Sequence, residues 1–256
     1  MREGESMLTH PTLEGLQALK LSGMARALAE QLELPAAEAL PFLERLGLLV
    51  DREQAERAQR RLTTRLRAAR LREQACLEDL DLRAPRGLDR ALILSLGGGE
   101  WVRRHRNVLI SGPTGTGKTY LACALAQSAC RADYSARYAR LTRLLADLAL
   151  ARADGRYGKL MVSLARTDLL ILDDLGLQPL TDAERRDLLE ILEERHGRRS
   201  TLVSSQLPLA SWHESLGDPT LADAILDRLV HNAYKIELHG ASMRKRRAGF
   251  DDDGKG

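Results

Sequence analysis

Cysteine is scarce in this chain, and its placement excludes two common ways of stabilising a fold. The 256 residues contain three cysteines, Cys76, Cys123 and Cys130, and no two of them have the C-x-x-C spacing. Disulfide frameworks and zinc sites both need cysteines that are more numerous or more closely spaced. Cys123 and Cys130 fall in a predicted helix, where we expect them to be small core residues. The sequence therefore predicts neither a disulfide framework nor a zinc site.

Long apolar runs are also missing. No uninterrupted apolar segment is long enough to cross a bilayer, and residues 1–5 do not lead into the apolar core of a signal peptide. Hydrophobic residues make up 44% of the chain and charged residues 29%, which is typical of a folded soluble protein. We therefore expect a cytoplasmic protein with no membrane partner. Its length allows one large domain or one medium and one small domain, and we favour two domains.

The chain does contain a complete phosphate-binding loop. Residues 112–119 read GPTGTGKT and match the P-loop pattern G-x-x-x-x-G-K-S/T. The glycines are needed because backbone N–H groups must turn inward around an anion. An apolar run precedes the loop and a helix pattern follows it, so bound phosphates would lie at a helix N-terminus. We predict that ATP is bound by Gly112, Pro113, Thr114, Gly115, Thr116, Gly117, Lys118 and Thr119, with Lys118 on the β and γ phosphates and Thr119 on Mg²⁺.

An acidic motif follows the P-loop. Residues 168–174 read DLLILDD, an apolar run that ends in two acids. This pattern predicts a buried strand whose carboxylates lie at the carboxyl edge of a parallel sheet. At that edge Asp173 would hold Mg²⁺, and Asp174 would orient or deprotonate the attacking water. The alternative interpretation is an ordinary buried strand with a helix-capping aspartate.

Two further segments carry polar residues of interest. Residues 200–206 predict another strand with a polar end, where Ser205 or Gln206 would contact the γ-phosphate and the attacking water. A polar turn at the end of a strand explains the same residues. Arg228 is isolated among apolar neighbours in the predicted helix 223–229. An unpaired buried arginine is costly, so Arg228 either pairs with Asp227 or another local acid, or projects from the subunit.

Positive charge is concentrated locally, although the net charge is only +3. Residues 57–72 contain no acid and no aromatic residue, and as a helix they would show a narrow apolar stripe between arginines. We predict contacts with the phosphates of duplex DNA that depend little on base sequence. A solvated helix paired with acids elsewhere is the alternative. The arginines of this stretch are Arg57, Arg60, Arg61, Arg65, Arg67, Arg70 and Arg72.

The segment 152–159 is a second candidate for DNA contact. It combines basic residues, two glycines and one aromatic residue, and a solvated loop explains the same composition. The residues that we expect to contact DNA here are Arg156, Tyr157 and Lys159.

The order of predicted elements indicates two domains and a tail. Residues 8–50 show short helix patterns separated by breakers, and a longer helix follows Pro41, with a break expected near Gly47. Strands and helices then alternate, which predicts a parallel sheet covered on both faces. We expect strands near 107–111, 135–140, 168–173, 200–205 and 234–238. The predicted divisions are a helical domain at 1–78, an α/β domain at 79–248 and a disordered tail at 249–256.

These elements together resemble the AAA+ ATPases, and within them the IstB-like transposition helpers of insertion sequences, relatives of the DnaC helicase loaders. The resemblance covers nearly the whole chain and includes LKLSGM at 19–24, FLERLGLL at 42–49, LDDLG at 172–176, SQLP at 205–208 and ADAILDRLVH at 222–231. It implies an α/β P-loop domain of three layers with a five-stranded parallel sheet and no lid or a vestigial one, preceded by a small all-α domain.

The resemblance also implies roles for two arginines. Arg228 would act as an arginine finger on the nucleotide of the neighbouring subunit, so that hydrolysis requires assembly. Arg244 is the candidate to replace the sensor arginine of a lid, and a simple basic tail is an equal alternative.

The function implied is that of an ATP-hydrolysing regulator of transposition. It would multimerise on duplex DNA, select the target and recruit or activate a transposase, with ATP hydrolysis controlling assembly. A DnaC-type replicative helicase loader shares this chemistry and differs in its client. A small-molecule kinase would need a substrate pocket and an arginine-bearing lid, neither of which the sequence indicates. A protein that senses ATP without hydrolysing it stays open, because Asp174 is one methylene shorter than glutamate.

Overall fold

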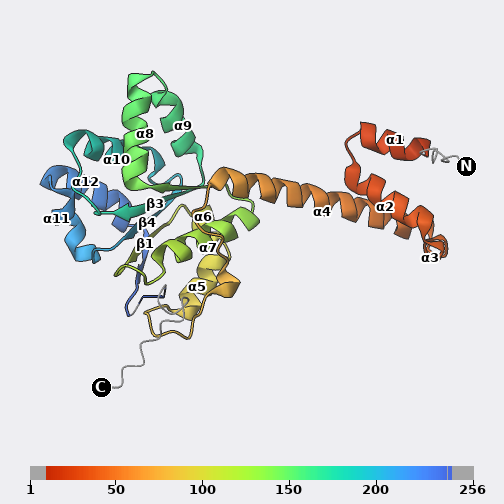
Figure 1. Ribbon diagram of the computed structural model, residues 1–256, viewed down its shortest axis with the longest axis horizontal. Helices are drawn as coiled ribbons and strands as arrows, with labels where there is room; N and C mark the ends of the chain where they lie inside the picture. Colours follow the sequence, from red (N-terminus) through yellow and green to blue (C-terminus); the bar gives the residue numbers. More distant parts are fainter. Residues whose placement is uncertain (1–9, 241, 244–256) are drawn as a thin grey trace, which may run out of the picture. The chain divides into compact units, whose positions relative to one another are not determined.

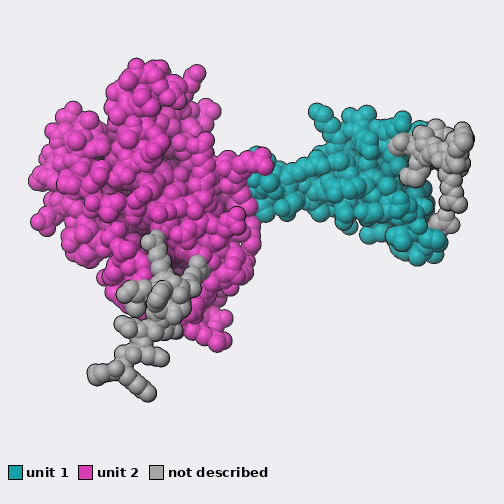
Figure 2. Space-filling view, in the orientation of Figure 1, with its two compact units in different colours: residues 1–64 teal, residues 65–256 magenta. Residues whose placement is uncertain are grey.

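The computed structural model describes residues 10–240, 242 and 243, and the chain divides into two compact units, 1–64 and 65–256 (Figure 2). This division, between residues 64 and 65, lies earlier in the chain than residue 78, the boundary that we predicted. The difference arises because Leu71 and Ala75 pack against Cys123 and Ala124 inside the second unit. The expected tail at 249–256 lies outside the described residues. Every helix in the described part of the chain is too short or too polar to cross a bilayer.

The first unit consists of helices. They are α1 (Pro11–Ala18), α2 (Ser22–Glu33), α3 (Pro35–Glu38) and the first part of α4 (Phe42–Ala69). The predicted break near Gly47 is wrong, because α4 runs through this residue as one helix. A single glycine costs a helix only about 0.5–1 kcal/mol relative to alanine, which the packing of a long helix readily offsets.

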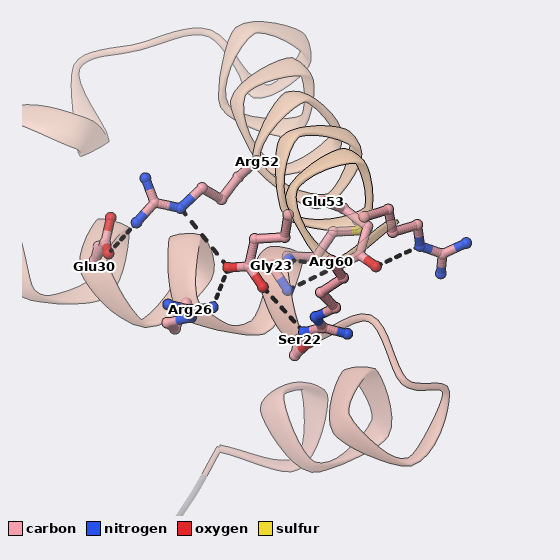
Figure 3. A network of polar contacts seen from close by, with 10 residues as sticks. Ser22, Gly23, Arg26, Glu30, Arg52, Glu53 and Arg60 are labelled. Carbon is pink, nitrogen blue, oxygen red and sulfur yellow. Dashed lines mark hydrogen bonds and ion pairs between the residues drawn. The ribbon is translucent and has the colours of Figure 1, made fainter. Parts of the chain in front are cut away.

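A polar contact between α2 and α4 organises this unit (Figure 3). The N-cap residue of α2, Leu21, offers no side-chain cap. Instead the Glu53 carboxylate accepts hydrogen bonds from the backbone N–H groups of Gly23 and Met24, at 2.7 and 3.2 Å. A negative charge at this position satisfies the free donors of the helix and opposes the positive end of its dipole.

Gly23 is required by the same contact. A Cβ atom at this position would lie 2.7 Å from the Glu53 Cα and 2.9 Å from the Arg52 carbonyl oxygen, which are backbone atoms that cannot turn aside. The LKLSGM segment of the sequence therefore encodes the close approach of two helices.

The second unit is built on a parallel five-stranded sheet in the order β2-β3-β4-β1-β5. Figure 1 labels its central strands β3, β4 and β1. The prediction of this sheet is confirmed. The central strands β1 and β3 contain continuous apolar runs, as expected of a sheet covered on both faces. The central strand β4 is equally buried but carries serine and threonine at four of its six positions. The strands are β1 (Asn107–Ser111), β2 (Ala136–Arg140), β3 (Leu169–Leu175), β4 (Ser200–Ser205) and β5 (Ala233–Glu237).

Helices cover both faces of this sheet and complete three layers. The P-loop helix α7 packs against β1 to β4, while α8, α10 and α12 pack with the core cluster that includes Leu109, Leu172 and Val203. Cys123 and Cys130 are fully buried in α7, which confirms that they are core residues. The helices of this unit are α5 (Arg90–Gly97), α6 (Glu100–Arg103), α7 (Lys118–Arg131), α8 (Leu141–Ala153), α9 (Tyr157–Arg166), α10 (Asp182–Arg195), α11 (Trp212–Leu216) and α12 (Pro219–Val230), with short 3-10 helices at Leu77–Asp79 and Leu209–Ser211.

Two buried charged residues of α10 hold the helical layer together. Asp187 accepts hydrogen bonds from the Arg152 guanidinium and, at 3.0 Å, from the Tyr157 hydroxyl. Arg195 is 1% exposed and donates to backbone carbonyls of Leu164, Thr167 and Ser200. Burial and the nearby Arg199 lower the pKa of Arg195 to about 9, which leaves it charged at neutral pH. Its positive charge faces the C-terminal end of α9, where helix carbonyls are free.

Candidate nucleotide-binding site

The P-loop joins β1 to α7, as predicted. Gly112 has a φ of 141°, and a Cβ atom there would lie 2.2 Å from the Leu238 carbonyl oxygen. Gly117 has a φ of 95°, and a Cβ atom there would lie 2.8 Å from Nη1 of Arg86. Both positions therefore require glycine, for the backbone conformation and for the close packing around the loop. The chain after β5 returns along the loop, where the Met243 N–H donates to the Gly115 carbonyl at 2.8 Å.

Lys118 lies inside the cradle that the loop forms. Its Nζ atom is 2.6 Å from the Gly112 carbonyl oxygen and 2.8 Å from that of Pro113, and the residue is 7% exposed. A buried ammonium at the N-terminus of α7 adds its charge to the helix dipole. The cradle therefore fits the phosphate chain of a nucleotide.

Thr119 and Asp173 meet beside the cradle. The Thr119 hydroxyl donates to Oδ2 of Asp173 at 2.9 Å, and Asp173 is 1% exposed. Mg²⁺ prefers one or two protein oxygens together with water and substrate phosphates, so a hydroxyl and one carboxylate are a suitable set. The described residues contain no cluster of three or more metal-binding side chains, as this mode of binding would not need one.

Two more hydroxyl groups hold Asp173. Tyr138 on β2 donates to Oδ2 at 2.6 Å, and Ser204 on β4 donates to Oδ1. Burial raises the pKa of Tyr138, and the neighbouring Asp173 raises it further, so the phenol stays a donor. Sequence reasoning missed Tyr138, although its place near the end of a predicted strand next to 168–173 was a usable signal.

Asp174 points to the same cavity from a β-bulge. The pairing of β3 with β4 shifts register between Leu172 and Leu175, and Asp174 has a φ of 69°. Bulges are frequent beside active sites because they redirect a side chain. Arg140, at the end of β2, holds Oδ2 of Asp174 through Nε and Nη2 at 3.1 and 3.0 Å. Asp174 is thus placed at the cavity, and Arg140 is a second residue that sequence reasoning missed.

The two polar residues at the end of β4 differ in orientation. Ser205 is fully buried and donates to the Leu175 carbonyl at 2.7 Å, so its hydroxyl points into the protein interior and away from the cavity. Gln206 lines the cavity and accepts a hydrogen bond from the Thr114 hydroxyl at 2.7 Å. Of the two, Gln206 is therefore the residue that can reach a nucleotide phosphate or water.

Lys118, Thr119, Arg140, Asp174 and Gln206 line a cavity of about 410 Å³. The P-loop forms one side of it, and the chain segment before β1 forms another through Arg72, Leu80 and Arg86. Arg86 donates to the Thr116 carbonyl at 3.2 Å and to the Asp81 carbonyl at 3.1 Å. The cavity is large enough for a small-molecule ligand of nucleotide size.

Arg228 lies at the other edge of the sheet. Its backbone carbonyl accepts a hydrogen bond at 3.0 Å from the side chain of Asn107, the first residue of β1, whereas the P-loop follows the last residue of β1. Its guanidinium lies 3.4 Å from both Glu193 and Asp227 and is 31% exposed. Arg228 is therefore absent from the cavity of its own chain. Arg244 lies outside the described residues.

A family model of IstB-like ATP binding proteins matches residues 14–249. The chain belongs to this family. It is 56% identical to an insertion sequence ATP-binding protein of Sinorhizobium fredii over 239 residues, which cover 93% of this chain and 98% of the relative. It is 35% identical to the ATP-binding protein of insertion sequence IS21 of Pseudomonas aeruginosa over 237 residues, covering 91% and 89% of the two chains.

Two solved structures are similar in fold to this IstB-like chain. The crystal structure of DnaI matches with a TM-score of 0.56 at 22% identity, covering 65% of this chain and 92% of the other. That of the DnaC helicase loader matches with a TM-score of 0.50 at 21% identity, covering 59% and 89%. At these identities the likeness concerns the fold alone. It confirms the predicted α/β P-loop architecture, with its parallel five-stranded sheet, for the IstB-like chain.

In this IstB-like protein, four arginines of the 57–72 stretch have partners. Arg57 pairs with Glu53 at 2.7 Å and Arg60 with Glu56 at 3.1 Å, both one turn earlier in α4. Arg65 is bound to Asp133 and, at 2.8 Å, to the Cys130 carbonyl. The pKa of Arg72 is raised by the neighbouring Tyr138 hydroxyl, against the opposing effect of burial, and further by the charges of Asp173 and Asp174.

Arg61, Arg67 and Arg70 are different. Each is exposed, and the described residues place no acid within ion-pair distance of them. The sequence showed the charge density of this stretch, but only the structure separates free arginines from paired ones.

The second candidate for DNA contact lies at α8 and α9. The expected loop is shorter than predicted, because α9 begins at Tyr157. Arg156 pairs with Asp154, and the Tyr157 hydroxyl donates to Asp187 and Glu190. Arg156 and Lys159 line a second cavity of about 430 Å³ together with Arg137. Burial lowers the pKa of Arg137, and the positive charge of Arg70 lowers it further. Arg137 is thus a basic residue of this surface that sequence reasoning missed.

Proposed function

We propose that this protein is an ATP-hydrolysing, DNA-binding regulator of transposition. In this proposal it multimerises on duplex DNA, selects the target site and recruits or activates a transposase, with ATP hydrolysis controlling assembly. The observation that carries the proposal is the placement of the P-loop and Arg228 at opposite edges of one sheet. The relatives that are named as insertion sequence proteins support transposition over helicase loading, for which the likeness to the DnaC helicase loader is one of fold alone.

Each residue of the cavity has a task in the proposed hydrolysis. Gly112 to Gly117 direct backbone N–H groups at the phosphate chain, and Lys118 neutralises it. Thr119 and Asp173 would hold Mg²⁺, which neutralises charge on the β and γ phosphate oxygens when it is bound. Asp174 accepts a hydrogen bond from the attacking water, and Gln206 orients that water. Because Arg140 holds the Asp174 carboxylate, rotation of the Arg140 side chain would free Asp174 for this task.

Arg228 completes the site from a neighbouring copy. A guanidinium that approaches the γ-phosphate stabilises the charge that develops during transfer, which is worth on the order of a thousand-fold or more in rate. Since Arg228 cannot serve the cavity of its own chain, hydrolysis requires a multimer. The bond between Arg228 and the γ-phosphate would strengthen the interface with ATP and weaken it after hydrolysis, which links nucleotide state to assembly.

DNA is held in this proposal by two basic surfaces. The free arginines of α4 and the basic residues around α8 and α9 contact phosphates, and base sequence has little influence. Capture of a transposase, rather than a replicative helicase, by the ATP-bound protein tests the choice of client. Retention of helicase alone would favour the loader alternative.

The first test removes the phosphate contact. Lys118→Ala is expected to lower ATP affinity at least about a hundredfold, because a charged contact inside a buried cradle is lost. Fluorescence titration with a labelled ATP analogue measures this effect. Lys235→Ala serves as control, since Lys235 is exposed on β5. Equal ATP affinity of the Lys118 variant and the unaltered protein would refute the P-loop assignment.

The second test asks whether Arg228 acts between subunits. Arg228→Ala is expected to bind ATP normally and to lose hydrolysis. Mixing it with the Lys118 variant should restore part of the activity, because a mixed interface joins an intact P-loop to an intact Arg228. Absence of rescue at every mixing ratio would instead assign Arg228 a structural role with Glu193 and Asp227.

A further inference from the structure

Arg72 occupies an unusual position for a member of an arginine-rich stretch. It lies three residues beyond the end of α4, and among the seven described arginines between 57 and 72 it is the one that lines the nucleotide cavity. Lys118, Thr119 and Asp174 line the same cavity. The residue that follows the proposed DNA-binding helix is therefore part of the wall of the nucleotide site.

Tyr138 joins Arg72 to the carboxylate proposed to hold Mg²⁺. The Arg72 guanidinium lies near the Tyr138 hydroxyl, which raises the pKa of Arg72. The Tyr138 hydroxyl donates to Oδ2 of Asp173 at 2.6 Å. A nearby cation polarises a hydroxyl and makes it a stronger donor, because polar groups in a low-dielectric site polarise one another. The chain from Arg72 through Tyr138 thus orients Asp173.

The hydrogen bonds to Asp173 are not equivalent. Thr119 and Asp173 share a bond that both would give up in order to ligate a cation. The bonds from Tyr138 and Ser204 come from other sides and can persist. Partners of this kind fix the orientation of a metal-binding carboxylate, and their removal typically lowers metal affinity about 10–100-fold.

The end of α4 is anchored to the P-loop helix. Arg65 binds the Cys130 carbonyl and Asp133 at the C-terminal end of α7, and Ala69 is completely buried. Arg67 and Arg70 lie on the same turns and are exposed. DNA phosphates bound by these two arginines therefore act on a short segment. Arg65 fixes one end of this segment, and the other end reaches the cavity at Arg72.

We propose that Arg72 and Tyr138 are positioning residues that couple the arginine-rich end of α4 to Asp173, so that duplex DNA and Mg²⁺-ATP strengthen each other's binding. The coupling rests on the proposed function, because it needs DNA at α4. It is reciprocal: whatever factor DNA adds to nucleotide affinity, the nucleotide adds to DNA affinity. A coupling factor on the order of tenfold is within the usual range.

Tyr138→Phe tests the link to Asp173. The affinity for a fluorescent ATP analogue is measured in EDTA and across a Mg²⁺ titration. We expect nearly unchanged affinity in EDTA and about a tenfold higher Mg²⁺ midpoint, because only the hydroxyl that orients Asp173 is lost. A purely structural role would alter both values together. An unchanged Mg²⁺ midpoint overturns the link.

Arg72→Gln tests the coupling to DNA. Nucleotide affinity with Mg²⁺ is compared with and without a random-sequence duplex. We expect the unaltered protein to gain affinity on the order of tenfold with DNA, Arg72→Gln to lose this gain while still binding DNA, and Arg72→Lys to recover part of it. Arg61→Gln is the control, expected to weaken DNA binding without moving the Mg²⁺ midpoint.

The outcomes separate this inference from the proposed function. If the unaltered protein binds DNA and nucleotide independently, or if Arg72→Gln keeps the full gain, the coupling is wrong and the proposed function stands. If the unaltered protein binds no duplex DNA, both fail. Loss of nucleotide affinity in Lys118→Ala reports on the P-loop alone.

Discussion

Arginine has opposite roles in α10 and in α4. Arg195 of α10 is buried, and its guanidinium donates to three backbone carbonyls from separate parts of the chain. Arg61, Arg67 and Arg70 in and just after α4 are exposed, and no acid of the described residues pairs with them. The first kind of contact stabilises the fold, whereas the second leaves charge available for a ligand.

This difference shows why composition alone does not identify a DNA-binding residue. The chain has 39 basic residues, and a buried one and a free one look alike in the sequence. A buried guanidinium must satisfy its donors within the protein, since leaving a buried polar group unsatisfied costs about 1–3 kcal/mol. An exposed one is hydrated, and exposed ion pairs contribute only about 0–1 kcal/mol.

We expect the largest effect on stability at Arg195, the buried arginine of this comparison. Arg195→Leu leaves the carbonyl oxygens of Leu164, Thr167 and Ser200 without this donor, so we expect a loss of about 3 kcal/mol in the free energy of unfolding. Urea denaturation measures it. Arg198→Leu, at an exposed position of the following turn, should change stability by less than about 0.5 kcal/mol. Equal stabilities of the two variants would contradict the role assigned to Arg195.

An intermediate effect is expected where α4 is itself part of a packed interface. Gly23→Ala would push its Cβ into the backbone at Arg52 and Glu53, so we expect a loss of about 1–3 kcal/mol in the stability of the first unit. Gly47→Ala is the matched control, because a Cβ there meets no atom within 4 Å. It should instead stabilise the helix by about 0.5–1 kcal/mol. Thermal unfolding followed by circular dichroism distinguishes the two, and a stabilised Gly23 variant would argue against the close contact.

The smallest effect on folding, and a specific effect on DNA binding, is expected for the free arginines. Replacing Arg61, Arg67 and Arg70 together with glutamine should leave stability within about 0.5 kcal/mol and lower the slope of log affinity against log salt by up to about 0.9 for each lost phosphate contact. Replacing Arg57 and Arg60, which have acidic partners, should change the slope less for each residue. An equal change for each residue would mean that the ion pairs of α4 do not limit access to phosphate.

Much of the fold followed from local patterns. The apolar runs before and after the P-loop predicted β1 and α7, and the five predicted strands match the observed ones to within one or two residues. Such patterns are informative because strands that are buried on both faces are rich in apolar residues, although half of the residues of the buried β4 are serines. The continuous helix α4 was not predicted, because Gly47 is a breaker only where packing does not hold the helix.

The candidate nucleotide site was predictable in part. The P-loop and the two acids of 168–174 are contiguous in sequence, so their spacing could be read directly. Tyr138 and Arg140 could not be assigned in the same way, because they meet Asp173 and Asp174 across two strands that are about thirty residues apart, and register decides which side chains meet. The orientation of Ser205 and Gln206 depends likewise on which strand neighbours β4.

The sequence by itself determined the order of strands and helices, the position of the P-loop, the carboxylates that follow β3's apolar run and the place of the chain among the IstB-like proteins. Only the tertiary structure decided which arginines are free, that Arg228 lies at the edge opposite the P-loop, and that Arg72 lines the cavity beside the P-loop. The physical reason is that a side chain's chemistry is local, whereas its burial and its partners come from distant segments. Arg65 and Asp133 form an ion pair across 68 residues of sequence, and no local pattern carries that information.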